Sequence, residues 1–365
     1  MQRKDREAQS AAAQRIRAAW RMRACAAGMA AGAQVFLLGT GVARPLCLNA
    51  AWIAGLAAVP ASALSAAACR QTLAHRRSKK LCRWLHGLLA LSFSLDAAFA
   101  AAALASLAEQ SLLPQTPAVH SLLMTCVAIA ACVLPGSTGC VRLAFALRFA
   151  LPVLLALLCV PVLAPAGGRG LFPILGTGTA QAFLGAGVML GAAFPALMLL
   201  YPPPEIRDMT DWEAYAVPDA AFFVRRVLLG AACGAALLLA VTLGGTYESM
   251  AAQHTWGERL MIAAGSRPSA GLPQTGIVLL QILSIALLAA NMLLAGMQAA
   301  QCAFAACRGN WQARVFCGAV FACAAAALLI TGFDAALLCT PVLLAALGLA
   351  LLFHRRLGGG DEDET

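Results

Sequence analysis

The sequence predicts an all-α integral membrane protein with about ten transmembrane helices, and three observations lead to this fold class. Hydrophobic residues make up 61% of the 365-residue chain and charged residues only 12%, whereas a soluble globular domain carries about 25% charged residues. Many apolar runs reach the roughly 20 residues that a helix needs to cross a bilayer. Nothing shows the alternation of polar and apolar residues that is typical of a barrel strand.

Apolar windows divide the chain into ten predicted spans. A basic arm, residues 1–23, precedes them, and an acidic tail, residues 358–365, follows with a composition that predicts disorder. The spans lie in one membrane domain, residues 24–357. In order they are 24–42, 46–68, 84–107, 119–134, 141–164, 180–201, 227–246, 275–305, 313–331 and 335–353.

Positive charges set the expected orientation, because cytoplasmic loops keep an excess of Lys and Arg. With the amino terminus inside, 22 of the 26 Lys and Arg residues fall in inner segments. The other four are Arg44, Arg169, Arg259 and Arg267. Both termini are therefore expected in the cytoplasm. The net charge of +10 predicts contact with anionic lipids and not with nucleic acid.

Two polar segments each allow two interpretations. The basic arm is either an amphipathic helix at the membrane surface, with Trp20 at the headgroup level, or a solvated tail. The inner loop 202–226 carries acidic residues and either contacts a partner or is a solvated connection.

The fourteen cysteines form no C-x-x-C pair, and the five histidines show no metal-ligand spacing. The sequence therefore predicts neither a metal site nor a cofactor. No Ser/His/Asp, Cys/His or paired-carboxylate arrangement recurs at one membrane face, so an enzyme is not expected.

Glycines two residues apart occur in both the first and the sixth predicted spans. They are Gly39 and Gly41 in the first, and Gly185 and Gly187 in the sixth, which also holds Gly191. In transporters with two inverted halves of five helices, the first helix of each half is unwound near the midplane. We therefore expect a 5+5 inverted repeat, residues 24–164 and 180–353, with broken helices 1 and 6. The alternative is that these glycines only permit close helix packing.

An unwound pair of helices would create a ligand site. Half-helix amino ends suit a carboxylate and free carbonyl groups suit an ammonium group, and an amino acid offers both charges. The candidate ligand-binding residues are Gln34, Gly39, Thr40, Gly41, Gly185, Gly187, Gly191 and Asn291. The polar side chains among them either line a cavity or form hydrogen bonds between helices.

Asp96 lies near the middle of the third span, where a buried ionisable group is costly and is a functional candidate by default. It would relay a proton or hold a cationic group. The structural alternative is a pairing with Arg148, or with a hydroxyl such as that of Ser92 or Ser94. Arg148 itself is expected to extend to the inner membrane surface.

Six short motifs occur in an order and at spacings that one known family shares. They are Leu112-Leu113 with Thr116-Pro117, Gly136 with Arg142-Leu143, Pro173-Ile174-Leu175-Gly176-Thr177-Gly178, Pro204-Glu205, Gly39-Thr40-Gly41 with Pro45, and Gly332-Phe333-Asp334. Together they resemble the spore germination permeases, which are the B-type subunits of nutrient germinant receptors. This family belongs to the amino acid/polyamine/organocation (APC) transporter superfamily. The likeness covers residues 33–356. The chain departs from the family in the sixth span, where Gly191 and its neighbours replace a frequent glutamate.

The resemblance implies a LeuT-like inverted-repeat fold and a small nutrient ligand, such as an amino acid. It also implies assembly with an A-type membrane subunit and a C-type lipoprotein in the inner membrane of a bacterial spore, where the complex detects nutrient and triggers germination. Two other functions remain open. One is a proton-coupled amino-acid permease that uses Asp96, and the other is a membrane scaffold subunit that does not transport.

Overall fold

The computed structural model describes residues 2–41, 50–74, 82–112, 115–133, 137–149, 152–153, 179–201, 218–243, 274–304 and 310–331. Within these ranges all regular structure is helical. Five of the described helices are long and apolar enough to cross a membrane. The chain is therefore a multi-pass helical membrane protein. The tenth predicted span and the acidic tail lie outside the described residues, so the count of ten spans stays a prediction.

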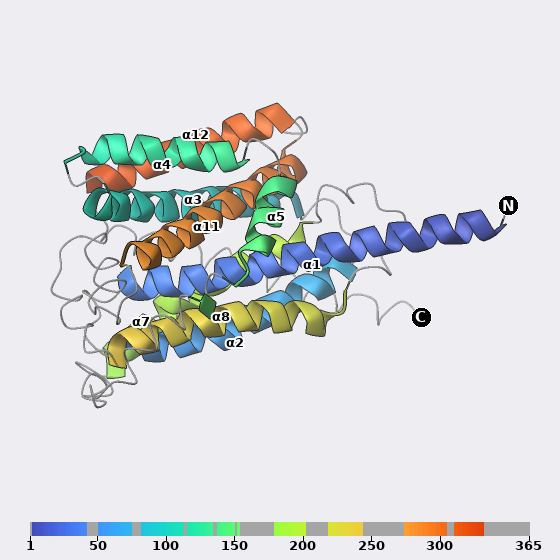
Figure 1. Ribbon diagram of the computed structural model, residues 1–365, viewed down its shortest axis with the longest axis horizontal. Helices are drawn as coiled ribbons and strands as arrows, with labels where there is room; N and C mark the ends of the chain where they lie inside the picture. Colours follow the sequence, from blue (N-terminus) through green and yellow to red (C-terminus); the bar gives the residue numbers. More distant parts are fainter. Residues whose placement is uncertain are drawn as a thin grey trace.

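Helical segments occupy at least part of each of the first nine predicted spans (Figure 1). They are α1 (Gln2–Gly41), α2 (Ala50–Ala74), α3 (Cys82–Ser111), α4 (Ala118–Val133), α5 (Ser137–Ala146), α7 (Thr179–Met189), the 3₁₀ helix η2 (Leu190–Leu200), α8 (Ala220–Leu243), α11 (Gln274–Ala303) and α12 (Asn310–Thr331).

The helices form two groups that pack side by side (Figure 1). In the first group, α1, α2, α7, η2 and α8 pack against one another. In the second group, α3 packs against α4, α11 and α12. The groups meet mainly where α1 contacts α11. The first group thus holds predicted spans 1, 2, 6 and 7, and the second holds spans 3, 4, 8 and 9, so each group takes corresponding helices from both predicted halves.

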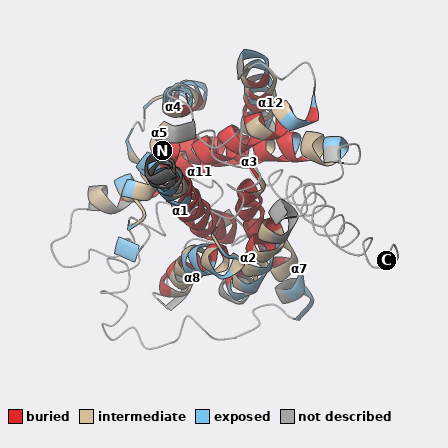
Figure 2. Ribbon diagram, turned by 90° about the vertical axis from the view of Figure 1, so that its right-hand side faces the viewer, coloured by how far each residue is buried: buried red, intermediate tan, exposed pale blue. Residues whose placement is uncertain are grey.

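The centre of the bundle is α1. Every residue of α1 from position 23 to position 40 is buried, and Figure 2 shows the buried parts of α1, α3 and α11 turned toward the middle of the bundle. Polar side chains such as Arg23 and Gln34, together with small residues such as Gly28, favour a place inside the helix bundle over contact with lipid.

The first helix differs from expectation in two ways. It is helical through Gly41, and Thr40 donates its hydroxyl hydrogen to the Leu37 carbonyl one turn earlier. The expected break at Gly39 and Gly41 is therefore wrong for the described residues. The basic arm is also part of α1, which forms one continuous helix of 40 residues, about 60 Å long. Trp20 is buried against Phe223 of α8, with ring centroids 5.5 Å apart, and does not lie on the surface of the protein.

Glycines bring α1 and α8 into close contact. Gly28 and Gly32 of α1, and Gly230 and Gly234 of α8, form two small-xxx-small pairs. A Cβ added to Gly230 would collide with the backbone oxygen of Gly28, and one on Gly234 with that of Gly32. Small residues at these spacings let helix backbones approach closely in membranes. Gly39 belongs to the same contact, because a Cβ there would collide with the side chain of Leu238. At Gly39 the packing interpretation is therefore the one supported.

This contact predicts the effect of enlarging Gly230. We expect Gly230→Val to lower the free energy of unfolding by about 1–3 kcal/mol or more, because backbone atoms cannot move aside as a flexible side chain can. Gly318→Ala is the control, since a Cβ at Gly318 in α12 meets nothing within 4 Å. Thermal unfolding in detergent measures both variants, and equal stabilities would contradict the close α1–α8 contact.

Candidate functional site

The sixth span is helical throughout its described part, but its helix type changes within the membrane. It runs as α7 to Met189 and continues as η2 from Leu190 to Leu200 without an unwound segment. The expected unwinding is therefore replaced by a tighter helix. Runs of 3₁₀ helix longer than three or four residues are uncommon, and a stretch in mid-helix often marks a hinge or strain. Pro195 lies within η2, where its missing N–H removes one backbone donor.

The glycines expected to line the site stay in regular helices. Gly185 and Gly191 are buried, and Gly187 is half-buried with nothing within 4 Å of an added Cβ. Because the backbone stays helical at these positions, its N–H and C=O groups are engaged along the helix. The described glycines therefore do not supply the free backbone groups that the sequence led us to expect.

Two other predicted residues are brought together. The side-chain nitrogen Nε2 of Gln34 in α1 donates to Oδ1 of Asp96 in α3 at 2.6 Å. Both side chains are fully buried. This bond joins the first group of helices to the second, in a region where α1 and α3 are connected through side chains more than through backbone packing. Gln34 and Asp96 thus form a polar pair at the boundary between the two groups.

The pair presents hydrogen-bond acceptors. A carboxylate accepts only, so the Gln34 amide turns its nitrogen to Asp96 and its oxygen away. Within the described structure, Oε1 of Gln34 and Oδ2 of Asp96 have no hydrogen-bond partner. Buried polar atoms are rarely left in this state, and each one calls for an explanation such as a ligand, an ion or water.

Asn291 of α11 adds a third acceptor to the same core. Its Nδ2 donates to the Leu287 carbonyl one turn earlier at 2.7 Å, and its Oδ1 has no partner among the described residues. Its helix, α11, packs against both α3 and α1. Gln34 and Asp96 are joined by a hydrogen bond, whereas Asn291 bonds within its own helix.

The structural alternatives for Asp96 do not occur in the described structure. Arg148 donates to the Phe145 carbonyl at 3.0 Å, and its guanidinium lies over the rings of Phe145 and Phe149. Ser94 donates to the Ala90 carbonyl one turn earlier. The Ser92 hydroxyl has no hydrogen-bond partner among the described residues. Within the described structure the hydrogen-bond partner of the Asp96 carboxylate is therefore Gln34.

A second polar contact between the groups lies nearer the amino-terminal end of α1. Arg23 of α1 is fully buried, and its guanidinium donates to the Met198 carbonyl at 3.2 and 3.4 Å and to Oε1 of Gln298 in α11 at 2.7 Å. Met198 lies in the last turn of η2, where its carbonyl also accepts the Tyr201 backbone N–H at 3.3 Å, and a cation is favourable at this end of a helix. Arg23 therefore links α1, η2 and α11.

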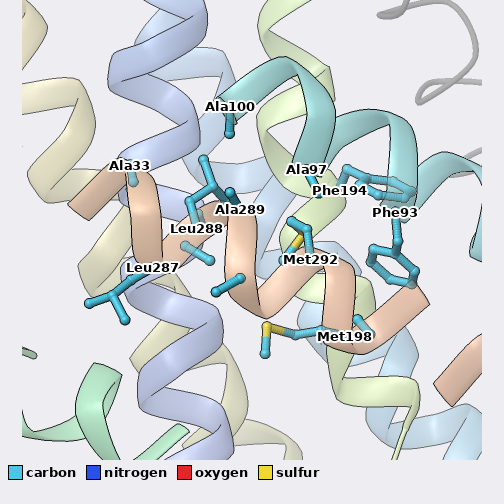
Figure 3. Packing of buried hydrophobic residues seen from close by; sticks show 14 of the residues in the cluster. Ala33, Phe93, Ala97, Ala100, Phe194, Met198, Leu287, Leu288, Ala289 and Met292 are labelled. Atoms are coloured by element: carbon cyan, nitrogen blue, oxygen red, sulfur yellow. The ribbon is translucent and has the colours of Figure 1, made fainter. Parts of the chain in front are cut away.

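Further contacts hold the same end of η2. The ring nitrogen Nδ1 of His86 in α3 lies 2.8 Å from the Tyr201 hydroxyl, and Phe93 of α3 packs on Phe194 with ring centroids 4.7 Å apart (Figure 3). Both contacts cross from the second group to the first. The carboxyl-terminal end of η2 is thus contacted by Arg23 of α1 and His86 of α3.

The sequence interpretation missed Arg23 because it assigned this residue to the cytoplasmic arm. A signal was available in the arm itself. Ile16, Ala19, Trp20 and Arg23 repeat at intervals of three and four residues, which places them on one face of a helix. All four are buried. This periodicity indicates that the helix enters the bundle well before residue 24.

Comparisons with known proteins support the fold. No protein-family model matches the chain, and no curated protein matches it in sequence. A mutant of the Eremococcus coleocola manganese transporter shares the fold, with a TM-score of 0.50 and 16% identity over 93% of this chain and 76% of that one. The same transporter bound to an aromatic bis-isothiourea compound has a TM-score of 0.50 and 15% identity, covering 92% and 76%. At such identities the likeness concerns the fold alone, which is that of a membrane transporter.

The Gln34–Asp96 bond predicts coupled effects on stability. Gln34→Leu removes the donor to a buried carboxylate, and we expect a loss of about 2–3 kcal/mol in the free energy of unfolding. Adding Asp96→Asn to this variant removes the charge and is expected to restore part of the loss. Thermal unfolding of the two single variants and the double variant forms a mutant cycle. Strictly additive effects would contradict the coupling.

Arg23 offers a second test with a neighbour as its control. Arg23→Met keeps much of the side-chain volume but leaves the Met198 carbonyl without these donors, so we expect a loss of about 1–3 kcal/mol. Arg21 lies two residues earlier on the same helix and is exposed. Arg21→Met is therefore expected to change the unfolding temperature little. The assignment of Arg23 to the bundle core would be wrong if both variants behaved alike.

Proposed function

We propose that this chain is the permease-like subunit of a spore nutrient germinant receptor. In this proposal it binds a small amino-acid-like nutrient where α1, α3 and α11 meet, and it passes a conformational signal to an A-type membrane subunit and a C-type lipoprotein. The six motifs shared with the germination permeases support the choice of family. The transporter fold supports a chain that receives a small solute within the membrane.

The buried Gln34–Asp96 pair is the observation that carries the binding site. A carboxylate in the middle of a membrane bundle is costly unless a cation, a proton or several donors accompany it. Here one amide donor is present, and two acceptor atoms of the pair have no partner in the described structure. A ligand with a positively charged group that carries N–H donors would supply the charge and the hydrogen bonds that these two oxygens lack.

The position of the pair also suits a receptor. Gln34–Asp96, Arg23–Gln298 and His86–Tyr201 all connect the first group of helices to the second. Transporters of inverted-repeat design move one such bundle against the other around a fixed site. A ligand that binds at the boundary can therefore favour one arrangement of the groups, which is the physical requirement for a signal.

The manganese named for the structural neighbours is not carried over to this chain. The polar groups of the Gln34–Asp96 pair are one carboxylate and one amide, which suit an organic ammonium group at least as well as a metal ion. Among the described residues, no three His, Cys, Asp or Glu side chains lie close enough together to hold a metal ion.

A proton-coupled amino-acid permease is the second candidate, and one specific observation favours it. Oδ2 of Asp96 has no partner in the described part of the chain, so this oxygen is open to protonation. Protonation would remove the buried charge and change the preferred arrangement of the two groups. Both candidates therefore use the same carboxylate, but only the permease moves its ligand across the membrane.

The function can be tested in lipid nanodiscs and in proteoliposomes. We expect amino acids from a panel of the twenty standard compounds to raise the unfolding temperature of the wild-type chain, and Asp96→Asn to abolish this effect. Ser62→Ala is the control, because the Ser62 hydroxyl is buried in α2 and donates only to its own helix at Ala58. Binding without uptake of the labelled amino acid supports the receptor subunit.

The other outcomes point elsewhere. Uptake that Asp96→Asn eliminates would favour the permease. If no amino acid binds and the chain still co-purifies with an A-type subunit and a lipoprotein, the scaffold function replaces the receptor. Failure of both binding and co-purification would overturn the proposed function.

A further inference from the structure

We propose that the site recognises the amino end of its ligand, so that a simple aliphatic primary amine binds without a carboxylate. This inference rests on the proposed function and narrows its ligand class from amino-acid-like molecules to primary ammonium compounds. The atoms that carry it are Oε1 of Gln34 and Oδ2 of Asp96.

The first step concerns which atoms of the site donate hydrogen bonds and which accept them. Both atoms are acceptors when Asp96 is ionised, because the amide nitrogen of Gln34 is already used toward Asp96. Both side chains are fully buried, and neither oxygen has a partner within the described residues. A protonated primary amine offers three N–H donors and no acceptor, as a lysine ammonium group does.

The second step concerns charge. Arg23 and Asp96 are the buried charged side chains among the described residues. Arg23 lies eleven residues before Gln34 on α1, about 16 Å along the helix axis, and it is engaged with Met198 and Gln298. The pair therefore presents a negative charge with no described cation beside it. A ligand carboxylate placed there would face another carboxylate and the amide oxygen of Gln34.

The third step concerns the surroundings of the pair. Figure 3 shows Ala33 and Ala289 in the adjoining core, together with Ala97 and Ala100. Because these side chains are small, the aliphatic part of a ligand would have to displace few protein atoms. Phe93 precedes Asp96 by three residues and so neighbours it on the surface of α3. An aromatic ring next to a carboxylate favours a bound cation further.

Matched sets of compounds test the inference on the full chain in nanodiscs. One set is L-alanine, ethylamine and propionate, and the other is L-leucine, 3-methylbutylamine and 4-methylpentanoate. We expect the amine of at least one set to raise the unfolding temperature at neutral pH, and the carboxylate to have no effect. Tetramethylammonium has the charge but no N–H donor, and it is expected to fail.

Single-residue variants test whether the amine binds at the Gln34–Asp96 pair. Asp96→Asn is expected to weaken amine binding at least tenfold and Gln34→Leu to weaken it as well, while Ser62→Ala leaves it unchanged. Because Gln34→Leu is expected to lower stability by itself, each variant is compared with and without the amine. Asp96→Asn retains a side chain of the same shape, and it decides the result if Gln34→Leu fails to fold.

Three results overturn the inference. They are binding of a carboxylate in place of its matched amine, amine binding that Asp96→Asn does not change, and binding of tetramethylammonium equal to that of the amines. If amino acids bind and no amine does, the inference fails while the proposed function stands. If neither amines nor amino acids bind, both fail.

Discussion

The burial of α1 on all sides is the constraint on which the rest of the structure depends. A helix without a lipid-facing side packs against other helices all round. The side chains that α1 uses for this differ between its two sides. Toward α8 it carries glycines that allow backbone contact. Toward the second group it carries Gln34 and Arg23, whose side chains reach α3 and α11. Close packing and polar recognition are thus separated on two sides of one helix.

The separation assigns different roles to the two interfaces of α1. At Gly28, Gly230 and Gly234 the contact between α1 and α8 involves backbone atoms, which cannot give way as a flexible side chain can, so α1 and α8 are expected to move as one body. The boundary with the second group consists of longer side chains and hydrogen bonds, which can exchange partners at lower cost. A transporter-like protein needs both kinds of interface, because it moves one rigid body along another. The candidate site lies at the boundary between α1 and the second group, where side chains can exchange hydrogen-bond partners.

The amino-acid sequence was sufficient for the class of protein, the approximate positions of nine helices and two residues of the central pair. These follow from local properties, because hydropathy reports burial in the membrane and a charge within a span is conspicuous. The pairing of Gln34 with Asp96 could not be predicted, since it depends on how distant helices pack. Arg23 was misassigned because counting charges does not show where a helix enters the bundle. The glycines of α1 were read as breaks because small residues serve both unwinding and close packing, and only the neighbouring helix distinguishes the two.

The 3₁₀ stretch η2 also has a mechanical consequence. Eleven residues rise about 22 Å as a 3₁₀ helix and about 16 Å as an α-helix. Conversion of η2 to the α form would therefore shorten the sixth span by about 5–6 Å and rotate its side chains relative to α7. Arg23 and His86 contact the carboxyl-terminal end of this segment, so the shortening would either draw α1 and α3 along with it or break their contacts. The same segment packs on Phe93, one turn from Asp96, which couples the surroundings of the buried carboxylate to the length of the sixth span.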